Sequence, residues 1–423
     1  MSRLAVIGAG YVGLTTAVCM AHLGHDVHCT DVSEDRIALL RSGQSPSHEK
    51  GLVELLRQGL DIGRLSFSTD NAEAARAAEF TFLCVQTPQG DDGRADMTYI
   101  ERAAKQIGPH LPTGSIVVSK STVPVGSTHV VERALERSDV TVASNPEFLR
   151  EGSAVHDFLH PDRIVIGAAD ESTAIKISAL FLRISTPVVV TDPATAETIK
   201  YACNAFLATK VSFVNEIAAL CEAVGADVRQ VVLGMGYDPR IGSEFLRPGP
   251  GWGGSCFPKD TAALIRIAEN AGCEFGLLKG VIAANEDQRA RVVTKTLRLV
   301  GGSVAGKTVA LCGLTFKALT DDLRDSPALD IARLLTEQGA RVQAYDPTVS
   351  QSIDGLEICS DPYAACAGAS VLVLATEWDE FRWLDFTKVS ELMALPAVVD
   401  ARNLLEPAVL RHLGFAYEGI GIV

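Results

Sequence analysis

A glycine-rich turn near the N-terminus constrains this chain more than any other segment. An apolar run from Leu4 to Ile7 predicts a strand, and Gly8-Ala9-Gly10-Tyr11-Val12-Gly13 follows it directly. A helical segment from Thr15 to Leu23 comes next, and a second apolar run, Val27 to Thr30, ends at Asp31. Glycines placed between a strand and a helix, with an acidic residue closing the next strand, are typical of a dinucleotide-binding βαβ unit.

The residues of this turn have separate expected roles. Gly8 permits the tight turn, Gly10 lets the backbone approach a pyrophosphate, and Gly13 lets the helix pack closely on the strand. The first turn of the helix offers unpaired N–H groups to phosphates. Asp31 can accept hydrogen bonds from both ribose hydroxyls and would repel a 2′-phosphate, which favours NAD over NADP, although Arg36 could stack on the adenine edge. The alternative is a structural turn with no ligand.

The strand–helix alternation continues through the first part of the chain. Short apolar runs follow at Phe80 to Val85, Ile116 to Ser119, Val140 to Ala143, Ile164 to Ile166 and Val188 to Val190. Helix-like segments alternate with several of these runs. The pattern predicts an α/β fold with a parallel, doubly wound sheet, and we assign residues 1–193 to this Rossmann-like domain.

The middle of the chain changes character. Apolar residues recur every three or four positions from Ala194 to about Gly225, which predicts one long helix able to connect two domains. A Gly/Pro-rich loop from Arg247 to Gly254 then interrupts a helical region that resumes after Pro258 and continues to about Val300. We assign residues 194–300 to a central helical domain.

The first pattern returns in the last part of the chain. Strands are expected at Lys307 to Gly313, at Arg341 to Tyr345, at Val371 to Ala375 and at Ala397 to Asp400, with a helix at Ala328 to Glu337. Residues 301–423 therefore predict a second Rossmann-like domain. It carries Gly313-Leu314-Thr315-Phe316-Lys317 in place of the glycine fingerprint, so we expect it to hold a different anionic group.

Composition excludes several classes of protein. The 423 residues are too many for one ordinary core, and a net charge of −14 argues against a general nucleic-acid or membrane-surface protein. No run approaches the roughly 18 apolar residues that a membrane span needs, and the chain opens on a strand with no secretion signal. The ten cysteines form no CxxC pair and no metal-like spacing with histidine. We expect reduced thiols, no metal and a cytoplasmic protein.

The most distinctive chemical segment is Gly253-Gly254-Ser255-Cys256-Phe257-Pro258-Lys259-Asp260. Two glycines let the backbone lie close to a ligand, and Pro258 suits the first turn of a helix. A cysteine at a helix N-terminus and near lysines has its thiolate favoured, which makes Cys256 a candidate nucleophile. The alternative for any cysteine is a small buried apolar residue.

Several motifs in a fixed order resemble the UDP-glucose/GDP-mannose dehydrogenase family over essentially the whole chain. They are GAGYVG at the start, Thr87-Pro88, Ser121 to Gly126 (STVPVG), Asn145 to Gly152 (NPEFLREG), Lys200 with Asn204, and GGSCFPKD around Cys256. The resemblance implies that the central domain forms a homodimer around its long helix and that the C-terminal domain binds a UDP-sugar. Phe257, after the cysteine, favours the UDP-glucose branch, since the GDP-mannose branch tends to have leucine there.

The activity implied by the resemblance is oxidation of UDP-glucose to UDP-glucuronate with two NAD. Cys256 would trap the intermediate aldehyde as a thiohemiacetal, which becomes a thioester and is then hydrolysed by water. Glu147 would act as the base, and Lys200 and Asn204, four residues apart on one helix face, would stabilise the tetrahedral species. Asp260 would hold Lys200 charged and could orient water, and Thr122 could hydrogen-bond that water.

The resemblance also assigns the binding residues. The cofactor set is Gly8, Gly10, Tyr11, Val12, Gly13, Asp31, Arg36, Thr87, Pro88, Thr122, Glu151 and Arg324. The substrate set is Phe148, Leu149, Arg150, Lys200, Asn204, Arg240, Phe245, Arg247, Gly249, Gly253, Lys317 and Arg402. Arg240 matches a residue that the family contributes across the subunit interface.

Simpler interpretations stand beside these. Asp260 could be a first-turn carboxylate favoured by the helix dipole, Glu147 and Glu151 a solvated helix start, and Lys200 a surface lysine. Lys317, Arg324 and Arg402 could each form a surface salt bridge. Functional alternatives are the same oxidation of TDP-glucose or GDP-mannose, a two-electron NAD dehydrogenase that needs no Cys256, and a non-catalytic NAD-binding regulator.

Overall fold

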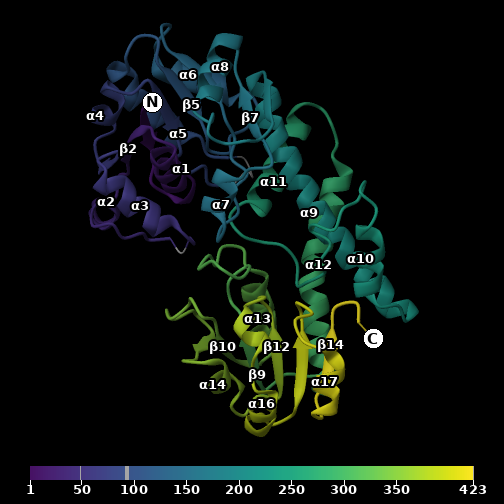
Figure 1. Ribbon diagram of the computed structural model, residues 1–423. Helices are drawn as coiled ribbons and strands as arrows, with labels where there is room; N and C mark the ends of the chain where they lie inside the picture. Colours follow the sequence, from purple (N-terminus) through teal and green to yellow (C-terminus); the bar gives the residue numbers. More distant parts are fainter. Residues whose placement is uncertain (48, 91–94, 423) are drawn as a thin grey trace. The chain divides into compact units, whose positions relative to one another are not determined.

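The computed structural model describes residues 1–47, 49–90 and 95–422, which divide into two compact units. The first unit comprises residues 1–203 and 262–271, and the second comprises residues 204–261 and 272–423. The long helix α9 (Pro193–Val224) and the helix α11 (Phe257–Asn270) each contribute residues to both units. Figure 1 labels the elements of both. The three-domain division drawn from the sequence stays a prediction.

The first unit is built on an eight-stranded sheet in the order β3-β2-β1-β4-β5-β6-β7-β8. Its strands are β1 (Arg3–Ile7), β2 (Asp26–Thr30), β3 (Leu65–Ser68), β4 (Phe80–Leu83), β5 (Ile116–Ser119), β6 (Thr141–Ser144), β7 (Ile164–Gly167) and β8 (Val188–Thr191). Its other helical segments are α1 (Tyr11–His22), α2 (Glu34–Arg41), α3 (Leu52–Asp61), α4 (Asn71–Arg76), α5 (Thr98–Ile107), the 3₁₀ turn η1 (Gly108–His110), α6 (Ser127–Leu135), α7 (Ala154–Leu159) and α8 (Glu171–Ala179).

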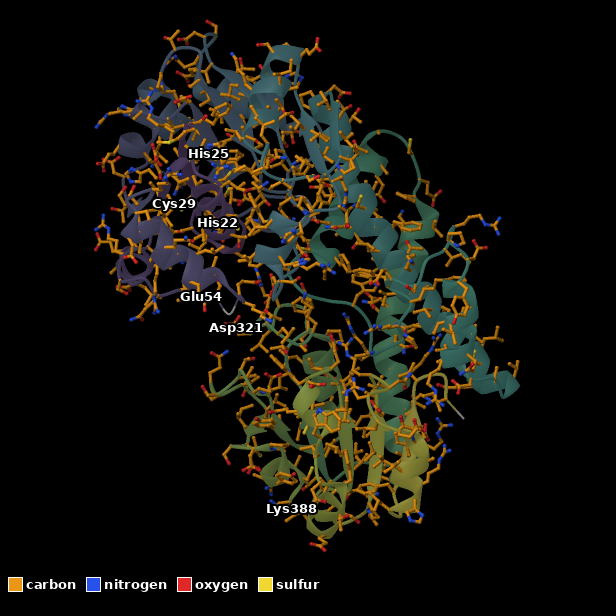
Figure 2. The ribbon with its side chains drawn as sticks, in the orientation of Figure 1. His22, His25, Cys29, Glu54, Asp321 and Lys388 are labelled. Carbon is orange, nitrogen blue, oxygen red and sulfur yellow. The ribbon has the colours of Figure 1, made fainter. Side chains whose placement is uncertain are left out.

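Both faces of this sheet are buried at its centre, as the doubly wound prediction requires, whereas the edge strand β8 is exposed. Leu4 and Val6 of β1 pack into one core with residues of α1, α2, α3 and α7, whereas Ala5 and Ile7 pack into another with α4, α5 and α6. The period of two along the strand thus places alternate side chains under helices on opposite faces. His25, labelled in Figure 2, ties the turn after α1 to the same unit, because its Nε2 lies 2.9 Å from the carbonyl oxygen of Leu180.

One part of the sheet prediction needs correction. Strands β1 to β6 are parallel, but β6 pairs with β7 in the antiparallel sense, through Ser144 and Gly167, and β8 then runs parallel to β7. The last two strands are therefore reversed. Single-strand periodicity cannot reveal this, because it says nothing about strand direction. The short strand β3 was also not predicted, since its sequence, LSFS, has only two apolar residues.

The second unit repeats the architecture with a six-stranded parallel sheet in the order β11-β10-β9-β12-β13-β14. Its strands are β9 (Thr308–Cys312), β10 (Arg341–Tyr345), β11 (Leu356–Ile358), β12 (Val371–Leu374), β13 (Ala397–Asp400) and β14 (Ala416–Gly419). Its helices are α10 (Val228–Gly236), α12 (Gly276–Leu299), α13 (Pro327–Glu337), α14 (Pro362–Cys366), α15 (Asp379–Arg382), α16 (Phe386–Leu392) and α17 (Pro407–His412).

The two sheets share one strand order, 3-2-1-4-5-6, over six strands, which confirms the predicted echo of the N-terminal domain. In the second unit Val309 and Leu311 pack under α12 and α13, and Ala310 and Cys312 pack under α14, α16 and α17. The predicted helix after Pro258 is two helices, since α11 begins at Phe257 and a break at 271–275 separates it from α12. Among the described residues, no helix combines the length and apolar character that a membrane crossing requires.

Candidate active site

The glycine turn after β1 has the geometry that a dinucleotide site needs. Gly8 has φ +100°, and a Cβ there would lie 2.8 Å from the carbonyl oxygen of Cys84. A Cβ on Gly13 would lie 1.8 Å from the carbonyl oxygen of Gly8, so helix and turn touch directly. A Cβ on Gly10 would meet nothing within 4 Å, which leaves open space at the N-terminus of α1. The residues present therefore fit a pyrophosphate bound at this turn.

Asp31 and Arg36 belong to the same turn. The Asp31 Oδ2 accepts hydrogen bonds from the backbone N–H of Ala9 at 2.9 Å and from Arg36 Nη1 at 3.0 Å. The carboxylate thus holds the glycine turn in place, and Arg36 forms an ion pair with it. The expected contacts of Asp31 with ribose and of Arg36 with adenine stay predictions.

Thr87 and Thr122 follow β4 and β5, which lie next to each other in the sheet. The Thr87 hydroxyl donates to the carbonyl oxygen of Thr122 at 2.8 Å. Both residues, together with Pro88, therefore lie at the carboxyl edge of the parallel strands, where α/β sheets bind their ligands. Tyr11 and Val12 form the first turn of α1 at this same edge.

A buried ion pair joins the segment that follows β6 to α9. Lys200 Nζ donates to Glu147 Oε1 at 2.9 Å, and both side chains are almost fully buried. The other carboxylate oxygen accepts from the backbone N–H of Leu149 at 2.6 Å. Burial alone would raise the pKa of Glu147, but the charge and hydrogen bond of Lys200, the Leu149 N–H and the charge of Lys120 together hold that pKa below its ordinary value. Glu147 is thus not a solvated helix start, nor is Lys200 a surface lysine.

Lys120 is a member of this cluster that sequence reasoning missed. It follows β5, is buried, and donates through Nζ to Asn145 Oδ1 at 3.0 Å. Burial lowers its pKa, against the opposing effects of Cys84 and Glu147. Asn145 in turn donates to the carbonyl oxygen of Val165 at 2.7 Å. The sequence did carry a signal, since Lys120 directly follows the apolar strand Ile116 to Ser119.

The residues after Glu147 line the same part of the first unit. The Phe148 ring stacks under Arg163, whose guanidinium carbon lies 3.7 Å from the ring centroid, and Lys200 Nζ lies 5.4 Å from the same centroid. Arg150 forms an ion pair with Asp157 at 2.6 Å. Glu151 is half-buried in the turn that precedes α7. The backbone of Leu149 is fixed by Glu147, so this segment is ordered around the carboxylate.

Cys256 lies immediately before the 14-residue helix α11. Its carbonyl oxygen accepts the N–H of Asp260 at 2.8 Å, which makes it the first residue of the helical hydrogen-bond pattern. Its thiol is half-buried, and Ser255 Oγ lies 3.6 Å from its Sγ. By contrast, Cys29, labelled in Figure 2, is fully buried in the first unit, and burial raises the pKa of its thiol. Cys256 thus has the position expected of a nucleophile at a helix N-terminus.

Asp260 lies in the first turn of α11 and is fully buried. It accepts from Asn204 Nδ2 at 2.6 Å and pairs with Lys259 Nζ at 2.5 Å. It is therefore more than a solvated carboxylate at a helix start, because it links α11 to α9. The expected pairing of Asp260 with Lys200 stays a prediction, and Lys259 supplies a partner that the sequence analysis did not name.

The two glycines before Cys256 pack against the loop that follows β9. A Cβ on Gly253 would lie 1.9 Å from the carbonyl oxygen of Asp325, and one on Gly254 would lie 2.8 Å from the Phe316 ring. Gly254 also donates its N–H to the carbonyl oxygen of Arg324 at 3.0 Å. The glycines thus let the cysteine loop lie directly on the 316–325 segment of the second unit.

The cationic candidates of the second unit have different surroundings. Arg402 is mostly buried and donates to the carbonyl oxygens of Ala375 at 2.8 Å and Phe316 at 2.9 Å, so it braces the loop after β9. Lys317 lies over the Phe316 ring, with Nζ 5.6 Å from the centroid. Arg324 pairs with Asp322 at 2.7 Å and is largely exposed.

The remaining candidates precede the cysteine in the chain. Arg240 pairs with Asp238 at 2.6 Å while its side chain is 88% exposed. Phe245 has φ 61° and packs near Phe257 with centroids 6.3 Å apart, and Arg247 is exposed. Gly249 is buried. Within the described ranges, no group of three or more His, Cys, Asp or Glu residues is arranged to hold a metal ion.

Comparison with known proteins accounts for most of the chain. Residues 2–185, 194–287 and 310–407 match three domains of the UDP-glucose/GDP-mannose dehydrogenase family, namely its NAD binding domain, its central domain and its UDP binding domain. The UDP-glucose 6-dehydrogenase of Rhizobium meliloti is 46% identical, covering 99% of both chains. The enzyme of the same name from Pseudomonas aeruginosa is also 46% identical, over 99% of this chain and 97% of its own.

Comparison with solved structures supports the same family. A UDP-glucose dehydrogenase from Pyrobaculum islandicum superposes with a TM-score of 0.92 at 40% identity, covering 100% of this chain and 98% of its own. A UDP-D-ManNAc dehydrogenase from Pyrococcus horikoshii gives a TM-score of 0.89 at 29% identity, over 99% of both chains. With a fitting NAD turn, a cysteine at a helix start and all three domains matched, the chain belongs to the UDP-glucose/GDP-mannose dehydrogenase family, whose members are NAD-dependent oxidoreductases.

Proposed function

We propose that this chain oxidises UDP-glucose to UDP-glucuronate, with two NAD reduced for each sugar. The names of the relatives support the substrate. The observation that carries the proposal is the position of Cys256, whose half-buried thiol stands at the start of α11 while six of the ten cysteines are buried. A thiol at a helix N-terminus is suited to act as a nucleophile, which supports a reaction that passes through covalent attachment.

NAD held at the glycine turn by Gly8, Gly10, Gly13 and the first turn of α1 supplies the electron acceptor for both oxidations. The chain's own residues do the rest. The alcohol first loses a hydride and a proton to become the aldehyde. The Cys256 thiolate then adds to the aldehyde carbon and gives the anion of a thiohemiacetal, which after loss of a second hydride is a thioester. Water adds to the thioester, and the C–S bond breaks to release the carboxylate, two protons and the thiolate. In total one alcohol and one water yield one carboxylate, two hydrides and three protons.

Glu147 and Lys200 suit the hydrolytic half of this reaction. Glu147 is kept ionised by its buried ion pair with Lys200 and by the Leu149 N–H, so it can accept a proton from the attacking water. Lys200 carries a buried positive charge that can stabilise the oxyanion of the tetrahedral species. The two groups act as a pair, since proton transfer to Glu147 frees Lys200 to face the oxyanion.

Asn204 and Asp260 suit the positioning of that oxyanion and of water. Asp260 accepts from Asn204 Nδ2, which fixes the orientation of the Asn204 amide one helical turn from Lys200. Asp260 is fully buried one helical turn after Cys256, and Lys259 balances its charge. We therefore assign Asn204 as the second donor to the oxyanion, and Asp260 as the residue that orients it.

The test is the number of NADH formed per sugar by purified protein given NAD and a panel of UDP-, TDP- and GDP-sugars. Two NADH per UDP-glucose, with little turnover of the other sugars, is expected. One NADH per sugar would refute the four-electron reaction, and preference for TDP-glucose, GDP-mannose or a UDP-amino sugar would reassign the substrate. Cys256→Ser should stall with aldehyde or a slowly cleaved ester bound, whereas rapid release of free UDP-glucuronate from it would contradict the thioester.

A homodimer around α9 is part of the same proposal. Phe206, Phe213 and Leu220 recur every seven residues and are each about half exposed or more, so they form one apolar stripe along the helix. Val214 and Ala218, which lie outside this stripe on the same helix, are fully buried, and Ala218 packs into the core of the second unit. An apolar stripe of this length on a surface helix is suited to a second copy of the chain.

A further inference from the structure

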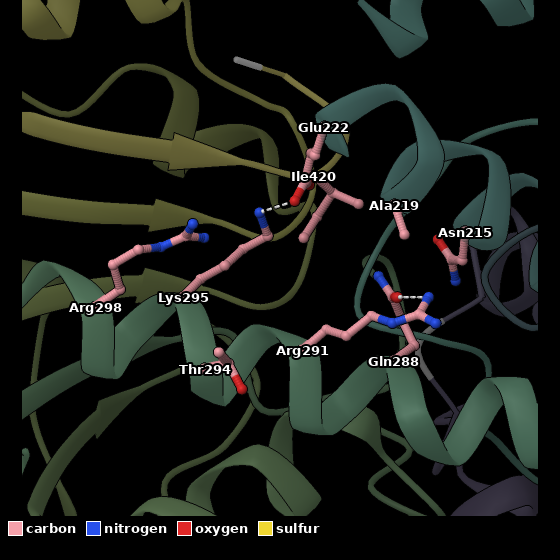
Figure 3. A pocket seen from close by; sticks show the side chains of 9 residues that line it. All are labelled: Asn215, Ala219, Glu222, Gln288, Arg291, Thr294, Lys295, Arg298 and Ile420. Carbon is pink, nitrogen blue, oxygen red and sulfur yellow. Dashed lines mark hydrogen bonds and ion pairs between the residues drawn. The ribbon is translucent and has the colours of Figure 1, made fainter. Parts of the chain in front are cut away.

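A polar pocket lies in the second unit, and the residues that line it are distant in sequence from the cysteine loop. Its accessible volume is about 150 Å³. Helix α9, helix α12 and the C-terminal segment form it, as Figure 3 shows. The lining residues are Asn215, Ala219, Glu222, Gln288, Arg291, Thr294, Lys295, Arg298 and Ile420. None of them belongs to the residues proposed above for the oxidation.

One hydrogen-bond donor in the pocket is buried and has no acceptor among the described residues. Asn215 is 1% exposed, and its Oδ1 accepts the N–H of Gly249 at 2.8 Å, which identifies the oxygen end of the amide. Its Nδ2 has no hydrogen-bond partner among the described residues. Figure 3 shows the Asn215 amide and the Arg291 guanidinium turned toward the same space. A buried polar group left unpaired is costly, so a ligand that accepts its hydrogen bond is favoured.

The cations of α12 point to the class of ligand. Arg291, Lys295 and Arg298 lie along one face of the helix, at spacings of four and three. Each already pairs with a carboxylate: Arg291 with Glu216 at 2.7 Å, Lys295 with Glu222 at 2.7 Å and Arg298 with Glu418 at 2.6 Å. These pairs use only part of the donors, since a guanidinium has five N–H groups and an ammonium three. The three cations therefore have donors beyond those that one carboxylate oxygen each can accept.

We propose that this pocket binds a small oxyanion, a phosphate or a short carboxylate, between Asn215 Nδ2 and the α12 cations. Pockets for drug-sized ligands are typically about 300–1,000 Å³, and this one is about 150 Å³, which favours a small anion over a nucleotide or a sugar nucleotide. The oxygens of the anion accept the hydrogen bonds that the pocket leaves unmade. Planar guanidinium donors match such oxygens well.

The pocket is connected to the loop that precedes Cys256. Asn215 accepts from the N–H of Gly249, and Gln288, a second lining residue, donates through Nε2 to the carbonyl oxygen of Gly249 at 2.7 Å. Gln288 Oε1 also lies 3.5 Å from Arg291 Nη1. An anion that fixes Asn215 and Arg291 therefore also helps to fix the N–H and the carbonyl group of Gly249. Resting on the proposed function, we infer that the bound anion changes the KM for the nucleotide sugar and leaves kcat nearly unchanged.

Asn215→Asp gives a sharp test, because it keeps Oδ1 for Gly249 and replaces the unpaired donor with a negatively charged oxygen beside Arg291. The carboxylate that this substitution introduces takes the place of the bound anion. We expect its Tm, without added anion, to exceed that of the wild type, and we expect phosphate to have no further effect on it. In the wild type, inorganic phosphate at constant ionic strength should raise Tm by about 2–5 °C and then saturate.

Two further variants separate binding from general salt effects. Arg333→Gln removes an α13 charge that pairs with Glu337 outside the pocket, and it should keep the full phosphate response. Arg291→Gln should lose that response, and it replaces Asn215→Asp should that variant not fold. A rise in Tm that never saturates and is equal in all variants would be the general stabilisation that phosphate gives proteins, and would overturn the site. Malonate in place of phosphate identifies which oxyanion binds more tightly.

The kinetic arm tests the connection to Gly249. A several-fold change in the KM for UDP-glucose with phosphate, absent in Asn215→Asp, is expected. A saturable Tm response without any change in KM would leave the oxyanion site in place and refute the connection. Absence of UDP-glucose oxidation altogether would refute the proposed function and not the pocket, because the Tm measurement needs no turnover.

Discussion

Replacing Lys200 with methionine should destabilise the first unit in a way that depends on pH. The change leaves Glu147 buried beside β6 without its ion-pair partner. Breaking a buried pair from one side typically costs about 3–5 kcal/mol, because the remaining charge is neither solvated nor paired. We expect a loss of that size in the free energy of unfolding at pH 7.5.

The sign of the pH dependence follows from the pKa of Glu147. In the wild type this pKa is held below its ordinary value, so the carboxylate contributes stability above the unfolded-state pKa, and that stability is lost as pH falls through the folded-state pKa. In Lys200→Met the largest effect left is burial, which raises the pKa. The buried carboxyl of the variant then takes up a proton as pH falls, and the difference from wild type should shrink between pH 7.5 and pH 5.

The measurement is urea unfolding followed by both far-UV circular dichroism and tryptophan fluorescence. All three tryptophans, Trp252, Trp378 and Trp383, belong to the second unit, so fluorescence reports on that unit while circular dichroism reports on both. Lys176→Met, an exposed lysine on α8 of the first unit, is the matched control and should have little effect. A loss no larger than in the control, or one that grows as pH falls, would refute the reasoning.

Three further predictions concern close contacts and the exposed stripe. Gly13→Ala should fail to fold or lose much stability, because its Cβ would overlap the Gly8 carbonyl, whereas Gly10→Ala should keep a near wild-type Tm and bind NAD at least tenfold more weakly by calorimetry. Gly253→Ala places its Cβ 1.9 Å from the Asp325 carbonyl oxygen, so it should displace the cysteine loop and lower kcat more than tenfold while the first unit's circular-dichroism transition is unchanged. Phe213→Glu on the apolar stripe should shift the sedimentation coefficient from dimer to monomer, and a wild type that is already monomeric would contradict the dimer.

The sequence predicted the two Rossmann-like sheets because their strands are short apolar runs separated by helices. It could not predict that β7 and β8 run opposite to the others, since direction depends on how the chain returns to the sheet and leaves no trace in side-chain periodicity. Cytoplasmic localisation likewise stays a prediction.

In the candidate site, the sequence identified the residues themselves better than the hydrogen bonds and ion pairs that they form. It named Glu147, Lys200, Asn204 and Asp260, and its pairing of Lys200 with Asp260 stays a prediction. It did not predict the contacts of Lys200 with Glu147 or of Asp260 with Asn204 and Lys259. Partners across long sequence separations follow from tertiary packing, which spacing along one helix cannot supply. Lys120 was passed over for a similar reason, because a lysine after a strand is most often at the surface.

The turn after β9 is fixed by the carboxylate of Asp346. Asp346 accepts from the backbone N–H groups of Leu314 and Thr315, at 2.8 and 3.1 Å, and from the Trp378 indole at 3.0 Å. In the N-terminal turn Asp31 likewise accepts the N–H of Ala9, but that turn has open space at Gly10. Here Thr315 stands at the matching position, fully buried, and its hydroxyl as well as its N–H bonds to Asp346. The two copies of the fold thus fix their turns with the same kind of carboxylate, and they differ in that the second has a buried side chain where the first leaves room for a phosphate.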